Sequence, residues 1–116
     1  YKLDNLTIFI DNNGLQIDGD ITDVMNPTPI DKKFEAFGWN VIKVSAHDYN
    51  ELYDAIEQAK ATKGKPTAII MKSIKGKNVS FMENNAAWHG SAPKENEYNQ
   101  AIAELDAIIK ELEARL

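Results

Sequence analysis

The stretch LTIFIDNNGLQIDG, residues 6–19, joins an apolar run to a loop of carboxylate, carboxamide and glycine residues. Leu6–Ile10 is continuously apolar with β-branched members, which predicts a strand buried on both faces. The Asn13-Gly14 step that follows is typical of a turn, which needs no ligand. The same oxygens are also suited to a hard cation and a phosphate, because open α/β sheets bind ligands at the carboxyl ends of their strands. Both interpretations stay open at this point.

Helix and strand patterns alternate after this loop. A helix is predicted to begin at Thr28-Pro29, as a cap and a first-turn proline, and to end at Gly38. Its apolar positions recur with helical spacing at Ile30, Phe34 and Phe37. Trp39–Val44 is the second predicted strand.

The next helix and strand complete the predicted sheet. Asp48 and Glu51 have capping-box spacing, and Gly64-Lys65-Pro66 ends the helix. The apolar stripe of this helix is Leu52, Ile56 and Ala59. Pro66–Lys72 is the third predicted strand. Each connection is long enough for a right-handed parallel crossover, so we expect a three-layer α/β fold with a mainly parallel sheet of about three strands and about three main helices.

Residues 95–116 form the clearest helical pattern. One stripe holds the apolar residues, and the other face holds the charged ones: Tyr98, Ile102, Leu105, Ile109, Leu112 and Leu116 against Glu97, Glu104, Lys110, Glu111 and Glu113. The stripe is short for a coiled coil. We therefore expect this amphipathic helix to pack on the α/β domain formed by residues 1–94.

A long loop, Ser73–Pro93, begins at the same sheet edge as the Asn-Gly turn. Loops of this length are usually functional or disordered. Lys75-Gly76-Lys77 is suited to cradling a phosphate, although such residues are usually solvated. His89 is suited to pairing with a phosphate or moving a proton, although a lone loop histidine is usually polar surface. His47, at a helix entry, is assigned to its turn.

Composition sets outer limits on function. A chain of 116 residues suits one domain with a sizeable core. The net charge of −5 and the lack of a basic stripe argue against nucleic acid as the main partner. The absence of cysteine excludes disulfides and thiolate chemistry. No apolar run has transmembrane length and no signal peptide is visible, so we expect no membrane partner and a cytoplasmic location. Because the chain begins at Tyr1, we expect it to be a piece of a longer protein.

Several blocks of the sequence resemble, in order, the thiamine diphosphate-binding part of transketolases. They are residues 1–19, Phe34–Val41, Gly64–Thr67, Lys75–Asn84 and Trp88–Pro93. Only the final helix is generic. The resemblance is to the amino-terminal subunit of two-chain bacterial and archaeal transketolases, which implies the thiamine diphosphate-binding fold in incomplete form.

The resemblance implies roles for particular residues. Asn13, through its side-chain oxygen, and Leu15, through its carbonyl, match ligands of a Mg²⁺ or Ca²⁺ ion. Ile17 and Ile74 match apolar residues that line the pocket of thiamine diphosphate. His89 matches a histidine that contacts the diphosphate and helps to move protons.

The chain also departs from the family pattern. The Gly-Asp-Gly half of the motif is absent, and its aspartate is the charged ligand of the metal. The pyrimidine-binding domain, which activates the cofactor through a glutamate, is absent too. The resemblance therefore implies that the partner is a pyrimidine-binding C-terminal transketolase subunit, in a homo- or hetero-oligomer such as a dimer. The implied activity is transfer of a two-carbon ketol unit between sugar phosphate substrates in the pentose phosphate pathway, with the isolated chain inactive.

Two alternatives remain. One is another thiamine diphosphate enzyme, such as a deoxyxylulose-phosphate synthase or a dehydrogenase component. The other is a non-catalytic α/β fragment that associates with itself, because an exposed sheet edge invites pairing with another chain.

Overall fold

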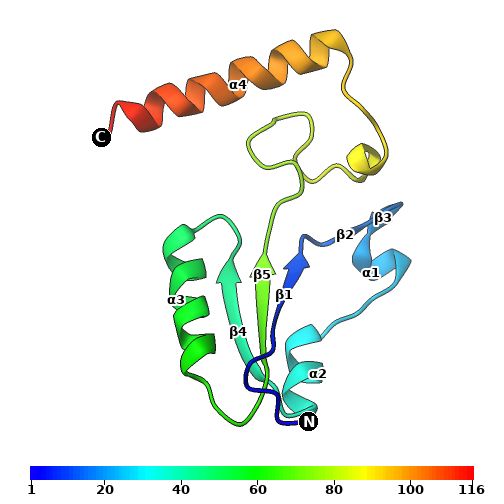
Figure 1. The fold of residues 1–116 in the computed structure, drawn as a ribbon. Coiled ribbons are helices and arrows are strands. Elements are labelled where there is room, and N and C mark those ends of the chain that lie inside the picture. Colours follow the sequence, from blue (N-terminus) through cyan, green and yellow to red (C-terminus); the bar gives the residue numbers. More distant parts are fainter.

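A three-stranded parallel sheet forms the centre of the computed structural model, which describes residues 1–116 (Figure 1). Strand β5 (Thr67–Lys72) lies between β1 (Thr7–Asn12) and β4 (Asn40–Ser45). Thr67 is opposite Thr7 on one side and Asn40 on the other, and the register continues to the ends of all three strands. The predicted parallel α/β sheet is confirmed.

Helices cover both faces of the sheet. Helix α3 (Tyr49–Ala61) places Ala55 and Ala59 against Ile69, with Ile42, Val44 and Met71 around them. Residues next to these along a strand point to the opposite face. Lys43 does so and pairs with Asp31 of α2 (Ile30–Ala36) at 3.0 Å, so α2 lies on the other face. The three-layer arrangement predicted from sequence is therefore present.

The strands differ in how far they are buried. Residues 67–70 of β5 are fully buried, as predicted. The prediction that the first strand is buried on both faces is wrong, because Phe9 is 50% exposed and burial alternates along β1. β1 is an edge strand, and the face that carries Phe9 is the one on which α3 covers β4 and β5.

The start of α2 differs from the sequence expectation. Pro29 is the N-cap and makes no side-chain cap bond, whereas the N–H and Oγ1 of Thr28 donate to Asn26 Oδ1 at 2.9 and 2.6 Å. Phe37 is the C-cap and is 83% exposed, so it is not part of the buried stripe. Gly38 ends the helix with φ of +81°, as predicted.

The cap of α3 is confirmed only in part. Asp48 accepts hydrogen bonds from the N–H groups of Asn50 and Glu51, as a cap should. Glu51 does not close a capping box, because its Oε2 accepts from the N–H of Ser45 at 2.7 Å. The buried positions are Ala55 and Ala59, while Ile56, placed on the apolar stripe, is 37% exposed.

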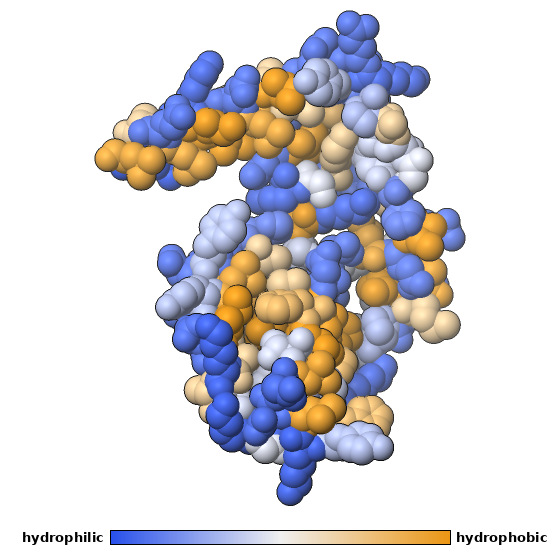
Figure 2. All heavy atoms as spheres, in the orientation of Figure 1, coloured by the Kyte–Doolittle hydropathy of each residue, from blue (hydrophilic) through white to orange (hydrophobic).

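Helix α4 (Glu95–Glu113) lies apart from the sheet, beyond the loop that follows β5 (Figure 1). The expected packing of its stripe on the sheet is not observed: none of its residues is buried, and Tyr98 and Leu112 are 55% and 54% exposed. Figure 2 shows the resulting apolar band along the helix. The reason is that Glu104, placed on the polar face by sequence, accepts from the N–H and Oγ of Ser80 at 2.7 and 2.6 Å. These bonds attach α4 to the loop, and the division at residue 94 stays a prediction.

The molecule is flat and extended, with principal dimensions of 51 × 41 × 17 Å. Its radius of gyration is 17.5 Å, against about 13 Å for a compact domain of this length. Only 8 of its 116 residues are buried, so the sizeable core expected from length is not formed. None of the helices combines the length and the apolar character that crossing a membrane requires.

Candidate functional site

An open groove of about 880 Å³ lies at the edge where the three parallel strands end. The arrowheads of β1, β4 and β5 in Figure 1 point to this edge. Each strand contributes to the lining, as do the segments after β1 and β5 and one residue of the helix that follows β4. The lining residues are Asn12, Asn13, Gly14, Lys43, Val44, Ser45, Glu51, Ile70, Lys72, Ser73, Ile74 and Asn84. The sheet edge inferred from sequence is thus the edge that carries the groove.

Asn13 occupies a tight turn beside the groove. Its Oδ1 accepts a hydrogen bond from the N–H of Leu15 at 2.9 Å, and Gly14 has φ of +76°. The turn interpretation of this stretch is therefore confirmed. It does not exclude a ligand, because a carboxamide oxygen has two lone pairs and this bond uses one.

The turn leads into a small hairpin that sequence analysis did not predict. It is formed by β2 (Leu15–Gln16) and β3 (Gly19–Asp20), and α1 (Ile21–Val24) follows directly. The N–H of Ile21 donates to the carbonyl of Gly14 at 2.9 Å, which ties the hairpin to the turn. Asp20 caps α1 by accepting from Thr22, and these hydrogen bonds lower the pKa of the Asp20 carboxyl.

The structure brings some of the predicted site residues together and leaves others apart. Asn13 and Ile74 both line the groove, and Leu15 is half-buried beside Asn13. Ile17 lies in the hairpin turn, is 58% exposed and does not line the groove. His89 is exposed at the end of η1 (Ala86–His89) and does not line it either. The roles assigned to all five stay predictions.

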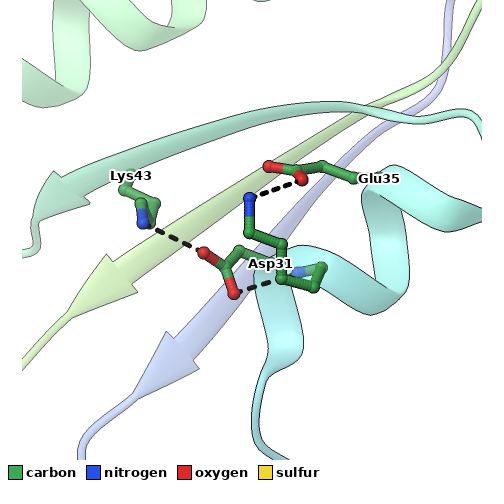
Figure 3. A network of polar contacts seen from close by, with 4 residues as sticks. Asp31, Glu35 and Lys43 are labelled. Atoms are coloured by element: carbon green, nitrogen blue, oxygen red, sulfur yellow. Dashed lines mark hydrogen bonds and ion pairs between the residues drawn. The ribbon is translucent and has the colours of Figure 1, made fainter.

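The charged side chains that line the groove are Lys43, Lys72 and Glu51. Lys43 pairs with Asp31, and this hydrogen bond, together with that from the N–H of Lys32, lowers the pKa of the Asp31 carboxyl (Figure 3). Lys72 makes none of the ion pairs of the chain. The carboxylate of the groove, Glu51, accepts from the N–H of Ser45. An anion entering the groove therefore meets Lys72 as an unpaired cation.

The loop after Ile74 folds on itself. Gly76 has φ of +68°, and a Cβ at this position would lie 2.5 Å from the carbonyl oxygen of Met82, so only glycine fits. Glu83 accepts from the N–H of Asn78 at 2.9 Å and pairs with Lys77 at 3.3 Å, and both interactions lower its pKa. Lys77 is thus engaged within the loop and does not line the groove.

An aromatic pair fixes the end of this loop. The rings of Phe81 and Trp88 lie 5.3 Å apart, and Trp88 Nε1 donates to the carbonyl of Phe81 at 3.0 Å. Asn85 caps η1 by accepting from the N–H of Ala87. These contacts hold η1 in place, and His89, its last residue, lies outside the groove.

Sequence analysis missed two residues at this edge. His47 Nε2 accepts from the N–H of Ile74 at 2.8 Å, although the histidine was assigned only to its turn. Ser73 Oγ donates to the carboxylate of Asp11, which joins the ends of β5 and β1. The available signal was position: each of these residues lies at or just after the end of a strand predicted to be parallel.

Comparison with known proteins identifies the family. The family model described as the transketolase, thiamine diphosphate binding domain matches residues 1–107. The chain belongs to this family. The resemblance of the sequence blocks to transketolases is confirmed.

Relatives agree with this assignment. Within the transketolase family, the chain is 42% identical over 106 residues to a 6-deoxy-6-sulfo-D-fructose transketolase subunit of Clostridium sp. (strain MSTE9), covering 90% of the chain and 38% of the subunit. It is 36% identical over 113 residues to an apulose-4-phosphate transketolase subunit of Phocaeicola vulgatus, covering 97% and 40%. The crystal structure of Campylobacter jejuni transketolase has a TM-score of 0.79 at 35% identity, over 86% of this chain and 16% of that one. The chain thus spans about two fifths of the length of the two subunits.

Proposed function

We propose that the chain is part of a thiamine diphosphate-dependent transketolase, which transfers a two-carbon ketol unit from a ketose phosphate to an aldose phosphate. The observation that supports this is the groove in which Asn13 and Ile74 meet at the carboxyl edge of the sheet, in a chain of the transketolase family. The groove receives the diphosphate end of the cofactor. In this proposal the chain alone does not turn over substrate.

The residues of the groove supply part of a site for a diphosphate and its metal ion. The free lone pair of Asn13 Oδ1 and the carbonyl of Leu15 offer neutral oxygens to Mg²⁺ or Ca²⁺, and Lys72 offers a cation to phosphate. No group of three or more His, Cys, Asp or Glu side chains gathers anywhere in the chain. The anionic contacts of the ion therefore come from the diphosphate and from surfaces outside this chain. When bound, thiamine diphosphate supplies the electron sink of the reaction.

The proposed roles of Ile17 and His89 require that other surfaces of the enzyme cover these two residues. Ile17 would line the apolar side of the cofactor, and His89 would contact the diphosphate and carry a proton. Both are exposed in this chain, so their contacts depend on the surfaces that cover them in the assembled enzyme.

The proposed partner is a pyrimidine-binding transketolase subunit, in a dimer or a larger oligomer. Two observations support a partner. The relatives are named as subunits, and the flat chain buries few of its residues, which leaves large apolar side chains such as Phe9 exposed. We propose sugar phosphates as substrates, and the cytoplasm and the pentose phosphate pathway as the setting.

A calorimetric titration of thiamine diphosphate with Mg²⁺ into this chain tests cofactor binding by the groove directly. We expect wild-type binding that EDTA abolishes and that Asn13→Ala weakens at least about tenfold. Asn26→Ala is the matched control, because Asn26 Oδ1 accepts two hydrogen bonds in a comparable turn but does not line the groove. Equal loss of affinity in both variants, or lower stability with unchanged affinity in Asn13→Ala, would leave Asn13 with a turn role only.

The whole activity is tested in the parent-length subunit with its pyrimidine-binding partner. We expect ketol transfer between sugar phosphates that stops when the cofactor is removed. Transfer that persists without the cofactor contradicts the proposal. A substrate panel that favours pyruvate as donor would instead support a deoxyxylulose-phosphate synthase.

A non-catalytic, self-associating fragment is favoured by one feature, the uncovered edge of β1. Light scattering on the isolated chain tests it. A monodisperse monomer counts against self-association through this edge.

A further inference from the structure

The hydrogen-bond ladder between β4 and β5 ends on a side chain. The last main-chain bond of the ladder runs from the N–H of Ala46 to the carbonyl of Lys72 at 2.9 Å. In a parallel ladder, the next bond would run from the N–H of Ile74 back to the carbonyl of Ala46. Instead, the N–H of Ile74 donates to His47 Nε2 at 2.8 Å. The imidazole takes the place of the main-chain acceptor just where β4 leaves the sheet.

The short segment after β5 is therefore held from both sides. On the β1 side, the N–H of Ser73 donates to the carbonyl of Asn12 at a long 3.4 Å, and Ser73 Oγ bonds to Asp11. On the β4 side, the shorter bond from the N–H of Ile74 to His47 Nε2 holds Ile74, which lines the groove. Removing the imidazole would leave the backbone of Ile74 without its acceptor on that side.

The turn that carries His47 is itself well fixed. The N–H of His47 donates to Ser45 Oγ at 3.2 Å, and the N–H of Ser45 donates to Glu51 Oε2 of α3 at 2.7 Å. The next residue, Asp48, caps α3. The main chain at His47 is thus tied through Ser45 to the first turn of α3, just before the N-cap of that helix.

We propose that His47 is a positioning residue, which places Ile74 against the groove by acting as the last acceptor of the β4–β5 ladder. It acts through Ile74 and not on a ligand. Because accepting through Nε2 requires a neutral ring, the proton of the imidazole resides on Nδ1. The consequence for cofactor affinity rests on the function proposed above, whereas the positioning of Ile74 does not.

Amide hydrogen exchange on the isolated chain tests the positioning. We expect the amide of Ile74 to lose at least about tenfold in protection in His47→Ala. Glutamine places its carbonyl oxygen near the site of Nε2, so His47→Gln restores the protection, while the shorter asparagine in His47→Asn does not. The amide of Thr67, which donates to the carbonyl of Leu6 at the other end of β5, reports global unfolding and stays unchanged. Equal protection of Ile74 in wild type and His47→Ala overturns the proposal.

Two further measurements separate positioning from general structure. Long-range ¹H–¹⁵N spectra of the imidazole should show the Nδ1–H tautomer, and an Nε2–H tautomer overturns the proposal. In titrations of thiamine diphosphate with Mg²⁺, the Kd should rise about tenfold in His47→Ala and return in His47→Gln. An unchanged Kd in His47→Ala overturns the link to the groove. If the wild-type chain binds no cofactor, that result counts against the proposed function of the groove and not against the role of His47. The exchange data still decide the role of His47.

Discussion

Replacing Gly76 with alanine should open the loop beside the groove while leaving the sheet intact. Gly76 and Gly64 have nearly the same backbone conformation, with φ of +68° and +76°. They differ in their surroundings: a Cβ at Gly64 would meet nothing within 4 Å, whereas one at Gly76 would lie 2.5–2.6 Å from three atoms of Met82, two of them main-chain. Gly64→Ala therefore measures backbone strain alone, and Gly76→Ala measures the same strain plus a steric overlap.

The magnitude follows from this difference. An L-residue in the left-handed region costs about 1–2 kcal/mol, and both variants lose this amount. Carbon atoms pack at about 3.5–4.0 Å, so relieving the overlap at Gly76 requires the backbone of Met82 to move by roughly 1 Å. That movement breaks the bonds from Met82 N–H to the carbonyl of Val79 and from Asn85 N–H to the carbonyl of Met82. At about 1 kcal/mol for each bond, Gly76→Ala should cost about 2 kcal/mol more than Gly64→Ala.

The assay is amide exchange combined with urea denaturation. The loop makes few bonds to the sheet, so the extra cost should appear as lost protection at Met82 and Asn85, with that of Ile70 in β5 unchanged. Equal losses in the two glycine variants would refute the steric argument. Loss of protection throughout the sheet in Gly76→Ala would refute the separation of the loop from the sheet.

Three further results are expected. Phe34→Ala removes the ring packed edge-on against Trp39, with ring centroids 5.3 Å apart, and should lower the free energy of unfolding by about 2–3 kcal/mol. Phe37 is 83% exposed, so Phe37→Ala should lower it by less than about 0.5 kcal/mol. Urea denaturation measures both changes. The hydroxyl and N–H of Ser80 lower the pKa of the Glu104 carboxyl below 4.5. The attachment of α4 is therefore complete above that value and is lost as pH falls through the lowered pKa, which exchange at Ser80 measures; wild-type pH dependence that persists in Glu104→Gln contradicts this assignment. Lys72→Met should raise the Kd of inorganic diphosphate several-fold in low salt, and an unchanged Kd would show that phosphate binds elsewhere.

The elements that sequence analysis predicted best are those with a long, uninterrupted hydrophobic pattern. β5 is apolar from Ala68 to Met71, and it occupies the central position that such a run requires. The run in β1 looks equally apolar, but burial of Phe9 depends on whether another element lies over it, which is a property of the fold and not of the run. The same limit applies to α4, whose stripe has regular spacing but no surface of this chain to pack on.

The candidate site was predictable as an edge and only partly as a set of residues. The strand-end rule located Asn13 and Ile74 in one groove. His47 also lies just after a strand end, but its bond to the N–H of Ile74 was not predicted, because that bond depends on the path of both segments after they leave the sheet. Nor did the strand-end rule show that Lys77 would be engaged by Glu83, since a salt bridge within a loop depends on the turns that Gly76 permits.

The order of the strands has a consequence for how the chain folds during synthesis. β5 is the last strand to be made, yet it is the only one that pairs with both others. β1 and β4 do not touch each other, and in a sheet with strands about 4.8 Å apart they are separated by the width of the missing strand. None of these three strands can therefore pair with another of the three until residues 67–72 have left the ribosome. Until then β1 and β4 lack the strand that joins them, and a translational pause after β5 would favour their pairing with it more than a pause before it.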